Sequence, residues 1–376
     1  MNELKKRTWA EINLNNIEHN YRAIRSILPE GTKFLGVVKA DAYGHGAYEV
    51  SKRLESIGAD YLAVACLDEA VELRDKGISL PILILGHTPP EYTGVLIEKS
   101  ITQAVSCEAK ARGYSQAAKE CGGTLKVHIK LDTGMSRMGF LDAGELFETG
   151  VDNVVRACKM DNLDVEGIFT HFAVSDVPGE ENEKYTQMQY KLFCDTYKAV
   201  EEKGGFTFHI HHCANSGATL KHPEFAMDMV RPGFMLYGYG DDENKLGLKP
   251  CMRFVSTIAT IKYQPEGTSV SYGRNYTTDK RTRMAVVCAG YADGLPWAAR
   301  GKCKFFTAGK KVPECGNICM DMCMIDVSEA PDAVVGGEVE LFGENVSVID
   351  MAEQSGTIAY EILCGVTKRV PRIYIG

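Results

Sequence analysis

Lys39 is the residue of this sequence whose type and place most directly indicate chemistry. It follows the apolar residues Phe34, Leu35, Val37 and Val38, which predict a short strand buried on both faces. A lysine at the carboxyl end of a buried parallel strand lies where α/β proteins place their functional loops. A partly desolvated amine there can lose its proton and attack a carbonyl. The alternative is a lysine that ends a strand and points to water.

Further polar residues come where later predicted strands end: Lys130, Asp132, Arg137, His171, Asn215, Ser216, Arg231 and Gly233. An anion beyond the last two strands would meet the side chains of Asn215 and Ser216 and backbone N–H groups near Gly233. A reactive lysine after the first strand and an anion site after the last two are what a pyridoxal phosphate enzyme requires. The amine forms the Schiff base and the anion site holds the phosphate of the cofactor.

The elements that must position these residues alternate regularly. An opening helix is predicted over 14–28, and eight strands near 34–39, 61–65, 81–86, 101–105, 124–132, 165–172, 206–213 and 226–231, most of them separated by helical stretches. Eight alternating strands predict a closed parallel (β/α)8 TIM-type barrel, with a doubly wound open sheet as the second choice. No Gly-x-Gly-x-x-Gly run follows an early strand, which weakens the open alternative.

After about residue 240 the pattern changes to short alternating strands joined by glycine and proline turns, as in MRFVSTIATIKY and GEVELFG. A last helical stretch, VIDMAEQSGTIAYEILCGV, precedes a closing strand. We therefore expect a barrel domain over residues 1–240 and a mostly β domain over 241–376. Within this division, the first ten or so residues of the chain can pack with the β domain.

Composition favours a globular protein that binds small molecules. The chain has 376 residues, 45% of them hydrophobic, which is enough for two cores. Its net charge of −8 argues against nucleic acid or an anionic membrane as the main partner. Residues 1–12 lack the apolar core of a signal peptide, so we expect a cytoplasmic location. Thirteen scattered cysteines fit reduced thiols better than a disulfide framework.

Along essentially its whole length the sequence resembles the bacterial alanine racemases, which are pyridoxal 5'-phosphate (PLP) enzymes. The resemblance is carried by WAEINL, VVKADAYGHG, KLDTGMSRMG, GIFTHFA, HHCANSGA, MVRPG with LYG, SYGRNY, GYADG, CGNICMDM, and TIAYEI with RVPRIY. Several long motifs in the right order make this signal specific. The fold that it implies is the predicted barrel followed by a β domain, and the activity is interconversion of L- and D-alanine for peptidoglycan.

The resemblance also implies roles for individual residues. Lys39 would hold PLP and act as one acid/base group, and Tyr272 would act as the other, contributed across a homodimer interface. The remaining positions divide between phosphate (Tyr43, Asn215, Ser216, Gly233, Phe234, Tyr360), the cofactor ring (His171, Arg231) and the substrate (Arg137, and Met320 and Asp321 from the second subunit). Lys130 matches a lysine that is often carbamylated in this family.

The chemistry explains why these residue types are needed. Racemisation removes a proton on one face and returns one on the other, so two bases must stand on opposite sides of a flat intermediate. A tyrosine is a poor base at neutral pH unless its neighbours stabilise the phenolate. The resemblance implies a chain from Tyr272 through His171 to Arg231 for this purpose. An arginine opposite the pyridine nitrogen cannot accept a proton, so the ring stays neutral and withdraws fewer electrons.

Two positions depart from the family. Asn317 and the segment Leu295–Pro296–Trp297 stand where many members carry arginines at the substrate entrance. Loss of two cations there would leave the chemistry intact but affect entry and amino-acid preference. The serine racemases of glycopeptide resistance are close relatives, and serine is the runner-up substrate. Tyr360 favours alanine, because a smaller polar residue would be needed to make room for a hydroxymethyl group.

Other classes of function remain as alternatives. A barrel that carries PLP without turnover would lack the β domain and Tyr272, and a related decarboxylase is disfavoured by Arg231 and by a short β domain. His209, His211, His212 and Cys213 alternate on a strand, but no carboxylate or cysteine pair nearby completes a metal site. Cys315, Cys319 and Cys323 are spaced by about 13 Å on strands, too far apart to share a metal.

Overall fold

The computed structural model describes residues 7–141, 144–241 and 243–376. The chain folds as two compact units. We call residues 17–40 and 47–249 the barrel unit, and residues 1–16, 41–46 and 250–376 the β unit. Each is described by itself.

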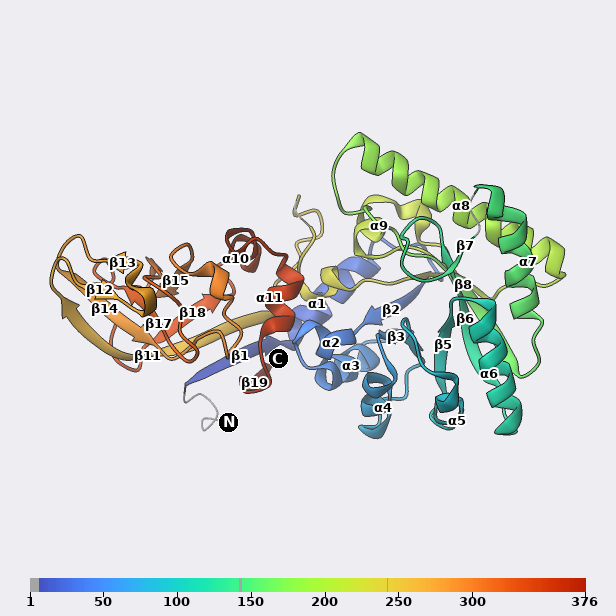
Figure 1. The fold of residues 1–376 in the computed structure, drawn as a ribbon, viewed down its shortest axis with the longest axis horizontal. Helices are drawn as coiled ribbons and strands as arrows, with labels where there is room; N and C mark the ends of the chain where they lie inside the picture. Colours follow the sequence, from blue (N-terminus) through green and yellow to red (C-terminus); the bar gives the residue numbers. More distant parts are fainter. Residues whose placement is uncertain (1–6, 142–143, 242) are drawn as a thin grey trace. The chain divides into compact units, whose positions relative to one another are not determined.

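The barrel unit holds parallel strands in the order β10-β2-β3-β4-β5-β6-β8-β9 (Figure 1). Their bounds are β2 Lys33–Val37, β3 Tyr61–Val64, β4 Ile82–Ile84, β5 Ile101–Val105, β6 Leu125–Asp132, β8 Leu163–Phe169, β9 Ile210–His212 and β10 Met229–Val230; β7, Phe140–Leu141, pairs only with β6. Two backbone hydrogen bonds join the ends of this order, from Asp228 to His211 and from Arg231 to Ala214. The sheet is thus a nearly closed eight-stranded barrel, and the predicted fold is confirmed.

Helices lie between these strands: α1 Leu14–Arg25, α3 Ala47–Ser56, α4 Leu67–Asp75, α5 Thr93–Glu98, α6 Glu108–Glu120, α7 Phe147–Cys158, α8 Glu180–Gly204 and α9 Ser216–Lys221. Helix α6 illustrates why they pack on the sheet. Its buried residues Ala111, Tyr114 and Ala118 recur at helical spacing and form one face. The strands β3, β4 and β5 are buried at every position, as expected when helices cover one face and the barrel interior the other.

Directly after β2 the backbone makes a left-handed turn, α2 (Lys39–Tyr43). Residues 40–43 all have φ between 52° and 54°, although none is glycine. Left-handed geometry costs an L-residue roughly 1–2 kcal/mol, so surrounding structure must hold this turn. Gly44 follows with φ 80°, and a Cβ there would lie 2.3 Å from the backbone oxygen of Leu363. The sequence predicts a turn here but not its handedness.

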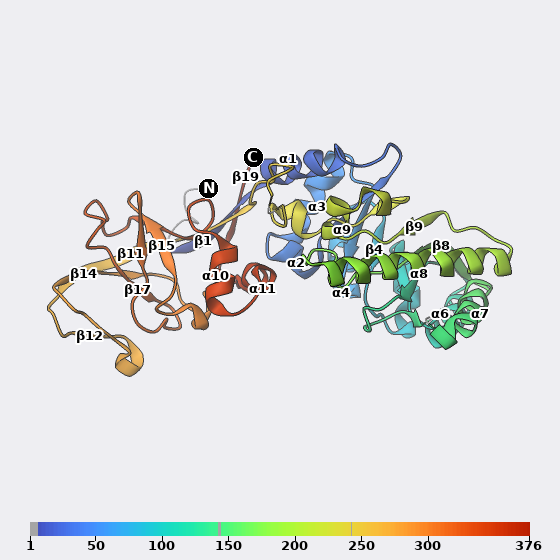
Figure 2. The same cartoon turned by 90° about the horizontal axis from the view of Figure 1, so that it is seen from above.

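The β unit contains a sheet in the order β16-β15-β18-β11-β1-β19, with β14 paired to β11 and β17 paired to β14. Figure 2 labels β1, β11, β14, β15, β17 and β19 of this sheet. The bounds are β1 Thr8–Asn13, β11 Met252–Gln264, β14 Thr282–Val287, β15 Lys304–Thr307, β16 Lys310–Pro313, β17 Cys323–Asp326, β18 Glu338–Phe342 and β19 Arg372–Ile375; β12 Ser269–Val270 pairs with β13 Tyr276–Thr277. The predicted strands of this region are therefore present. Strand β1 lies between β11 and β19.

Two helices, α10 (Val348–Ser355) and α11 (Ala359–Gly365), pack together in the β unit. The sequence predicts one continuous helical stretch here. Gly356 breaks it, because this residue ends α10 in the left-handed conformation with φ 70°. Ser347 begins α10 by accepting hydrogen bonds from the N–H groups of Ile349 and Asp350.

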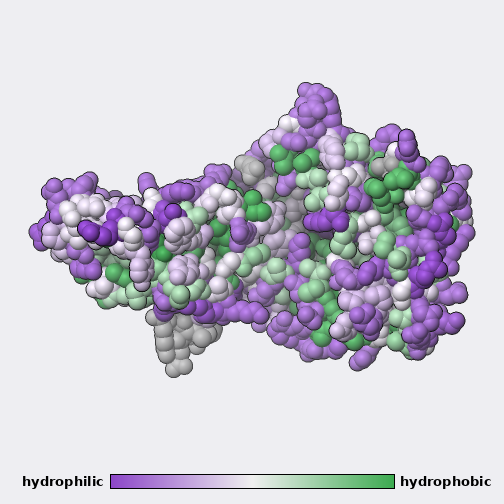
Figure 3. Space-filling model, in the orientation of Figure 1, coloured by the Kyte–Doolittle hydropathy of each residue, from purple (hydrophilic) through white to green (hydrophobic). Residues whose placement is uncertain are grey.

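Aromatic side chains fill the core of each unit: Phe34, Phe169, Phe172, Phe193 and Phe225 in the barrel unit, and Trp9, Phe254, Phe305 and Phe342 in the β unit. Hydrophilic residues predominate on the face drawn in Figure 3, and hydrophobic ones lie in small groups between them. Within the described residues, no helix combines the length and the apolar character that a membrane span needs.

Candidate active site

Arg231 is the centre of a buried polar group at the carboxyl ends of the barrel strands. Its side chain is 3% exposed and donates four hydrogen bonds. Nη1 donates to His212 Nδ1 (3.1 Å), while Nη2 donates to the backbone oxygens of Thr170 (2.7 Å) and Cys213 (2.9 Å) and to His171 Nδ1 (3.4 Å). Burial lowers the pKa of Arg231 to about 10, which still leaves it charged at neutral pH. The guanidinium is therefore fixed in direction as well as in charge.

The contact with Arg231 determines the protonation of His171. A guanidinium only donates, so His171 Nδ1 must be an acceptor and Nε2 must carry the proton of the neutral ring. Burial lowers the pKa of His171 well below its ordinary value, and the charge of Arg231 lowers it further. Arg137, Lys39 and Lys130 add to this effect, which places their charges near the ring. His171 is thus a neutral donor through Nε2.

Lys130 is a buried lysine among cations. It is 6% exposed, and its Nζ lies 5.6 Å from the ring centre of Phe169, which also faces the Arg231 guanidinium at 5.5 Å. Burial lowers the pKa of Lys130 to about 8, with further lowering by Arg137 and Arg231. A large fraction of this amine is therefore neutral near pH 8, as a reactive lysine requires.

Asp132 shapes the loop that carries Arg137. Its carboxylate accepts hydrogen bonds from the backbone N–H groups of Gly134 (3.1 Å), Ser136 (2.9 Å) and Arg137 (3.0 Å). Gly139 has φ 147°, and a Cβ there would lie 2.4 Å from the backbone of Leu131 and Asp132. The predicted substrate-side arginine is thus positioned by a turn that folds back on the end of β6.

The residues predicted for an anion site lie at the start of α9 and in the loop after β10. Asn215 Oδ1 accepts from the N–H of Ala218 (3.0 Å) and from Ser175 Oγ (2.7 Å). Ser216 Oγ accepts from the N–H of Gly233 at 3.0 Å, which joins the loop after β9 to the loop after β10. Phe234 stacks on Tyr239 with ring centres 5.1 Å apart. Residues Asn215, Ser216, Gly233 and Phe234 are therefore brought together, as predicted.

In the β unit, Tyr272 stands on a strained turn and is 74% exposed. Ser271 and Arg274 have φ 66° and 51°, in the left-handed region. Asn317 holds the turn: its Nδ2 donates to the Tyr272 backbone oxygen (2.7 Å) and its own backbone oxygen accepts from Ser271 Oγ (2.6 Å). Asn275 adds a weaker contact of 3.4 Å to Asn317 Oδ1.

Asp293 organises the predicted substrate-side segment. This fully buried carboxylate accepts from the guanidinium groups of Arg7 and Arg369 and from the N–H of Gly290. The same two arginines also bind Asp321. Arg369 donates to the Asp321 carboxylate (2.7 Å), and Arg7 donates to the Asp321 backbone oxygen (2.8 Å). Met320, 53% exposed, precedes Asp321. Asp293 therefore links the amino-terminal and carboxyl-terminal parts of the β unit through its ion pairs with Arg7 and Arg369.

Tyr43 and Tyr360 meet within the β unit, with ring centres 5.9 Å apart. Burial raises the pKa of the Tyr43 hydroxyl, and Tyr360 raises it further, so it stays protonated and can donate. The structure thus places the predicted residues in two groups. Lys39, Lys130, Arg137, His171, Asn215, Ser216, Arg231, Gly233 and Phe234 belong to the barrel unit, and Tyr43, Tyr272, Met320, Asp321 and Tyr360 to the β unit.

The comparison with known families decides what this arrangement is. The family model described as "Alanine racemase, N-terminal domain" matches residues 12–241, and "Alanine racemase, C-terminal domain" matches residues 251–374. The chain belongs to the alanine racemase family. The expectation raised by the sequence motifs is confirmed.

Curated and solved relatives agree with this assignment. "Alanine racemase 2" of Caldanaerobacter subterraneus subsp. tengcongensis is 42% identical over 98% of this chain and 95% of its own length. The structure of the alanine racemase of Clostridium difficile superposes with a TM-score of 0.91 at 40% identity, covering 99% of this chain and 97% of that one. A complex of that enzyme with cycloserine gives a TM-score of 0.89 at 39% identity, covering 99% and 96%.

Alanine racemases depend on PLP, and the residues of the barrel unit fit this group. Ser216 Oγ accepts from the N–H groups of Gly233 (3.0 Å) and Met235 (3.4 Å), so its own O–H can donate to a phosphate. Arg231 offers only donors, which suits a pyridine nitrogen that accepts. Lys39 follows the carboxyl end of β2 by two residues and would supply the amine.

Both departures from the family pattern take on a different meaning in the structure. Asn317 is 9% exposed and holds the Tyr272 turn, so the sequence interpretation of this position as part of the entrance alone is incomplete. Near Trp297, the guanidinium of Arg300 lies 3.5 Å from the centre of its ring. A cation is therefore present in this loop, three residues after the position where an arginine was expected.

Metal binding finds no support among the described residues, where no group of three or more His, Cys, Asp or Glu could hold an ion. His211 turns to Asp228 and Glu201, whereas His212 turns to Arg231 and His128. The alternation of the strand thus separates these histidines.

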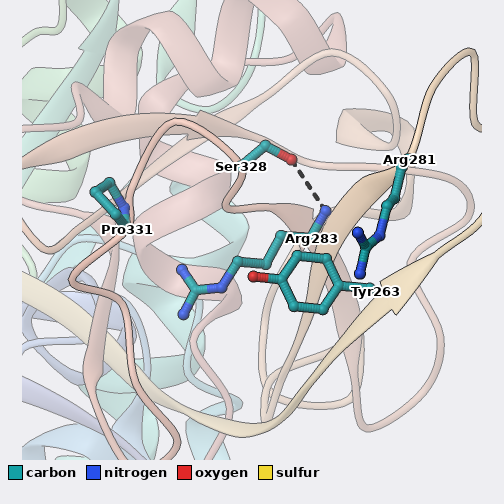
Figure 4. Close-up of a pocket in the computed structure, with 5 residues that line it drawn as sticks. All are labelled: Tyr263, Arg281, Arg283, Ser328 and Pro331. Atoms are coloured by element: carbon teal, nitrogen blue, oxygen red, sulfur yellow. Dashed lines mark hydrogen bonds between the residues drawn. The ribbon is translucent and has the colours of Figure 1, made fainter.

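A separate hollow of about 300 Å³ in the β unit is lined by Tyr263, Arg281, Arg283, Ser328 and Pro331 (Figure 4). Ser328 Oγ accepts from the N–H of Arg283 (3.0 Å), and the Arg283 guanidinium donates to the oxygens of Ala330 and Ala333. Arg281 lies over the Tyr263 ring at 4.6 Å. Both arginines are engaged by the protein, and no predicted site residue lines this hollow.

Proposed function

We propose that this chain is a PLP-dependent racemase that interconverts L- and D-alanine and supplies D-alanine for peptidoglycan in the cytoplasm. Family membership and the names of its relatives support the activity. The observation that carries the proposal is the buried Arg231, held by four acceptors at the barrel edge that also bears Lys39. A carboxylate at this place would have favoured another PLP chemistry.

Lys39 has two roles in this proposal. Bound PLP would supply an electron sink that makes the α-proton of the amino acid acidic. Lys39 Nζ would hold the cofactor, and as a free amine it would take or return the α-proton on one face. The phosphate would be held by Ser216 Oγ, by the N–H groups near Gly233 and Phe234, and by the loop that Asn215 caps. The hydroxyls of Tyr43 and Tyr360 are proposed for the phosphate because the family resemblance implies it.

Tyr272 of the partner subunit is proposed as the base on the opposite face. A phenolate needs a donor or a positive charge close by, since its ordinary pKa is about 10. His171 can donate through Nε2, because Arg231 occupies its Nδ1. The positive charge of Arg231 would act on the tyrosine through this ring.

Arg231 also controls what happens to the electrons of the broken bond. Its guanidinium carries donors only, so it would donate a hydrogen bond to the pyridine nitrogen and would not stabilise a protonated one. A ring kept unprotonated in this way would withdraw fewer electrons, which would restrain transamination and decarboxylation. On the substrate side, we propose that Arg137 binds the carboxylate of the amino acid. Lys130, once carbamylated, is proposed to support Arg137. Met320 and Asp321 are proposed to come from the second subunit.

A homodimer is proposed because functional apolar side chains of the β unit are exposed in the single chain. Tyr272 is 74% exposed, Met320 53%, Trp297 50%, Met322 46% and Tyr291 44%. Exposed apolar side chains that lie together mark interaction surfaces more often than scattered ones do. Alanine is preferred over serine because Tyr360, half-buried against Tyr43, keeps the space beside the substrate small.

The test offers L-alanine and L-serine separately to the PLP-loaded protein in heavy water and follows the α-proton by NMR and the product by chiral separation. We expect solvent deuterium at the α-carbon together with loss of optical activity, faster for alanine. Exchange without inversion would reject the second base. A faster reaction of serine would move the chain to the serine branch, and no exchange at all would favour a PLP carrier.

A further inference from the structure

Hydrogen bonds continue from Arg231 into the barrel, away from the residues proposed for catalysis. His212 Nε2 and His128 Nδ1 are 2.8 Å apart, and His128 Nε2 lies 3.0 Å from Glu166 Oε2. Both histidines are fully buried. The chain therefore runs from Arg231 through two imidazoles to a carboxylate on β8.

The direction of this chain follows from its two ends. Arg231 only donates, so His212 Nδ1 must accept and His212 Nε2 must carry the proton. This Nε2–H donates to His128 Nδ1, and His128 in turn carries its proton on Nε2 and donates to Glu166. Burial lowers the pKa of both histidines, and the charge of Arg231 adds to this, which agrees with neutral rings.

Glu166 terminates the chain as an acceptor. Besides His128 it receives Tyr61 Oη at 2.6 Å and Lys126 Nζ at 2.7 Å. Burial would raise the pKa of Glu166, but the hydrogen bonds from His128, Lys126 and Tyr61 outweigh it and lower the pKa to about 2. Glu166 is therefore an ionised acceptor at every working pH. A neutral group able to donate would permit the opposite tautomers, which would turn an N–H of His212 toward Arg231.

We propose that Glu166 is a positioning residue for Arg231: its carboxylate fixes the tautomers of His128 and His212, so that His212 presents an acceptor to the guanidinium. The catalytic consequence rests on the proposed role of Arg231, whereas the direction of the hydrogen bonds does not. Lys126 and Tyr61, near the amino ends of β6 and β3, hold the carboxylate in place. Residues at this end of a barrel usually serve stability alone.

The variant that tests this is Glu166→Gln. A carboxamide has one oxygen and one NH₂ group. Lys126 only donates, so it favours the oxygen at the place of Glu166 Oε1 and leaves the NH₂ group facing His128 Nε2. The chain would then reverse: His128 would donate from Nδ1 to His212, and His212 would turn an Nδ1–H against Arg231. The matched control is Tyr61→Phe, which removes one donor to Glu166 but keeps the carboxylate and the direction of the chain. Glu166→Asp is the conservative variant, in which the direction should persist.

The direct measurement is ¹⁵N NMR of the holoenzyme labelled at its nine histidines, assigned with single histidine variants. We expect the Nε2–H tautomer for His128 and His212 in the unsubstituted protein, in Tyr61→Phe and in Glu166→Asp. In Glu166→Gln we expect a shift to the Nδ1–H tautomer in at least one ring. An Nδ1–H signal from either ring of the unsubstituted protein would overturn the proposal, even if Glu166→Gln failed to fold.

Enzyme assays then separate positioning from simple stability. Glu166→Gln should lower kcat for alanine by roughly tenfold with little change in KM, and raise the share of transamination per racemisation event, because Arg231 is displaced. Unchanged kcat and partition despite altered tautomers would overturn the positioning role. If the unsubstituted protein shows the expected tautomers but does not racemise alanine, the proposed function fails while the hydrogen-bond direction stands.

Discussion

Arg231 and Tyr272 are held in opposite ways. The arginine is 3% exposed, and both terminal nitrogens of its guanidinium, Nη1 and Nη2, donate to acceptors within its own unit. The tyrosine is 74% exposed, and the contacts that fix it act on its backbone through Asn317. One chain thus completes the Arg231 hydrogen bonds by itself, whereas the proposed catalytic role of the Tyr272 side chain would require a second surface. This difference is the structural argument for a shared site.

The largest effect on activity is expected when the amine of Lys39 is removed. Lys39→Ala removes both the attachment of PLP and one of the two bases. We expect racemisation to fall by roughly 10³-fold or more, and exchange of the α-proton to fall with it. The absorption of the bound cofactor should change as well. Wild-type exchange rates in this variant would contradict the role of Lys39.

Tyr272→Phe tests the other side of the comparison. It keeps the ring and the turn but removes the hydroxyl, so the protein should fold and bind PLP normally. Racemisation should fall by roughly 10²–10⁴-fold, while exchange from the enantiomer served by Lys39 survives. Comparing exchange from L- and D-alanine measures this asymmetry. Equal losses for both enantiomers would mean that Tyr272 is not a face-specific base.

Lys130→Met tests whether the buried positive charge of Lys130 destabilises the folded protein, by measuring the free energy of unfolding. The pKa of Lys130 in the folded protein is about 8, below the ordinary 10.5, so the unfolded state binds more protons between these values. Stability should therefore rise with pH across this window, by roughly 3 kcal/mol at most. The variant should lose this rise in denaturant titrations made in buffer free of carbon dioxide. Lys119→Met on the exposed face of α6 is the control and should keep it.

The smallest effect is expected at the backbone clamp of Tyr272. Asn317→Ala removes the 2.7 Å hydrogen bond to the Tyr272 oxygen and should cost about 1–2 kcal/mol of stability. Loss of alignment should lower kcat by about tenfold, without changing PLP affinity. Asn275→Ala, which removes only the 3.4 Å contact, is the control. If the two variants have equal kcat, Asn317 does not position Tyr272.

The barrel and the residues at its strand ends could be predicted because the signals are local. Apolar runs of strand length predict each strand, and the polar site residues lie at or near the ends of these runs: Lys39, Lys130, His171 and Arg231. The cofactor roles needed the family resemblance in addition. The break at Gly356 had a local signal, a glycine within a helical pattern, which the sequence interpretation passed over.

Other features depend on contacts between distant parts of the chain. Residues 40–43 are poor candidates for a left-handed turn on propensity alone, since none is glycine. Asn317 acts on Tyr272 from 45 residues away, and Asp293 gathers Arg7 from 286 residues away. Glu166 left one weak signal, a charged residue within a predicted buried strand. A buried carboxylate of this kind requires hydrogen-bond donors that replace the water it loses.

The shared site is tested most directly by mixing two inactive chains. In a dimer of one Lys39→Ala chain and one Tyr272→Phe chain, one site combines both defects and the other combines intact Lys39 with intact Tyr272. Coexpressed in equal amounts, the chains form heterodimers as about half of all dimers, so activity should return to about a quarter of the unsubstituted level. Activity no higher than that of either variant alone would show that Tyr272 does not act across the subunits.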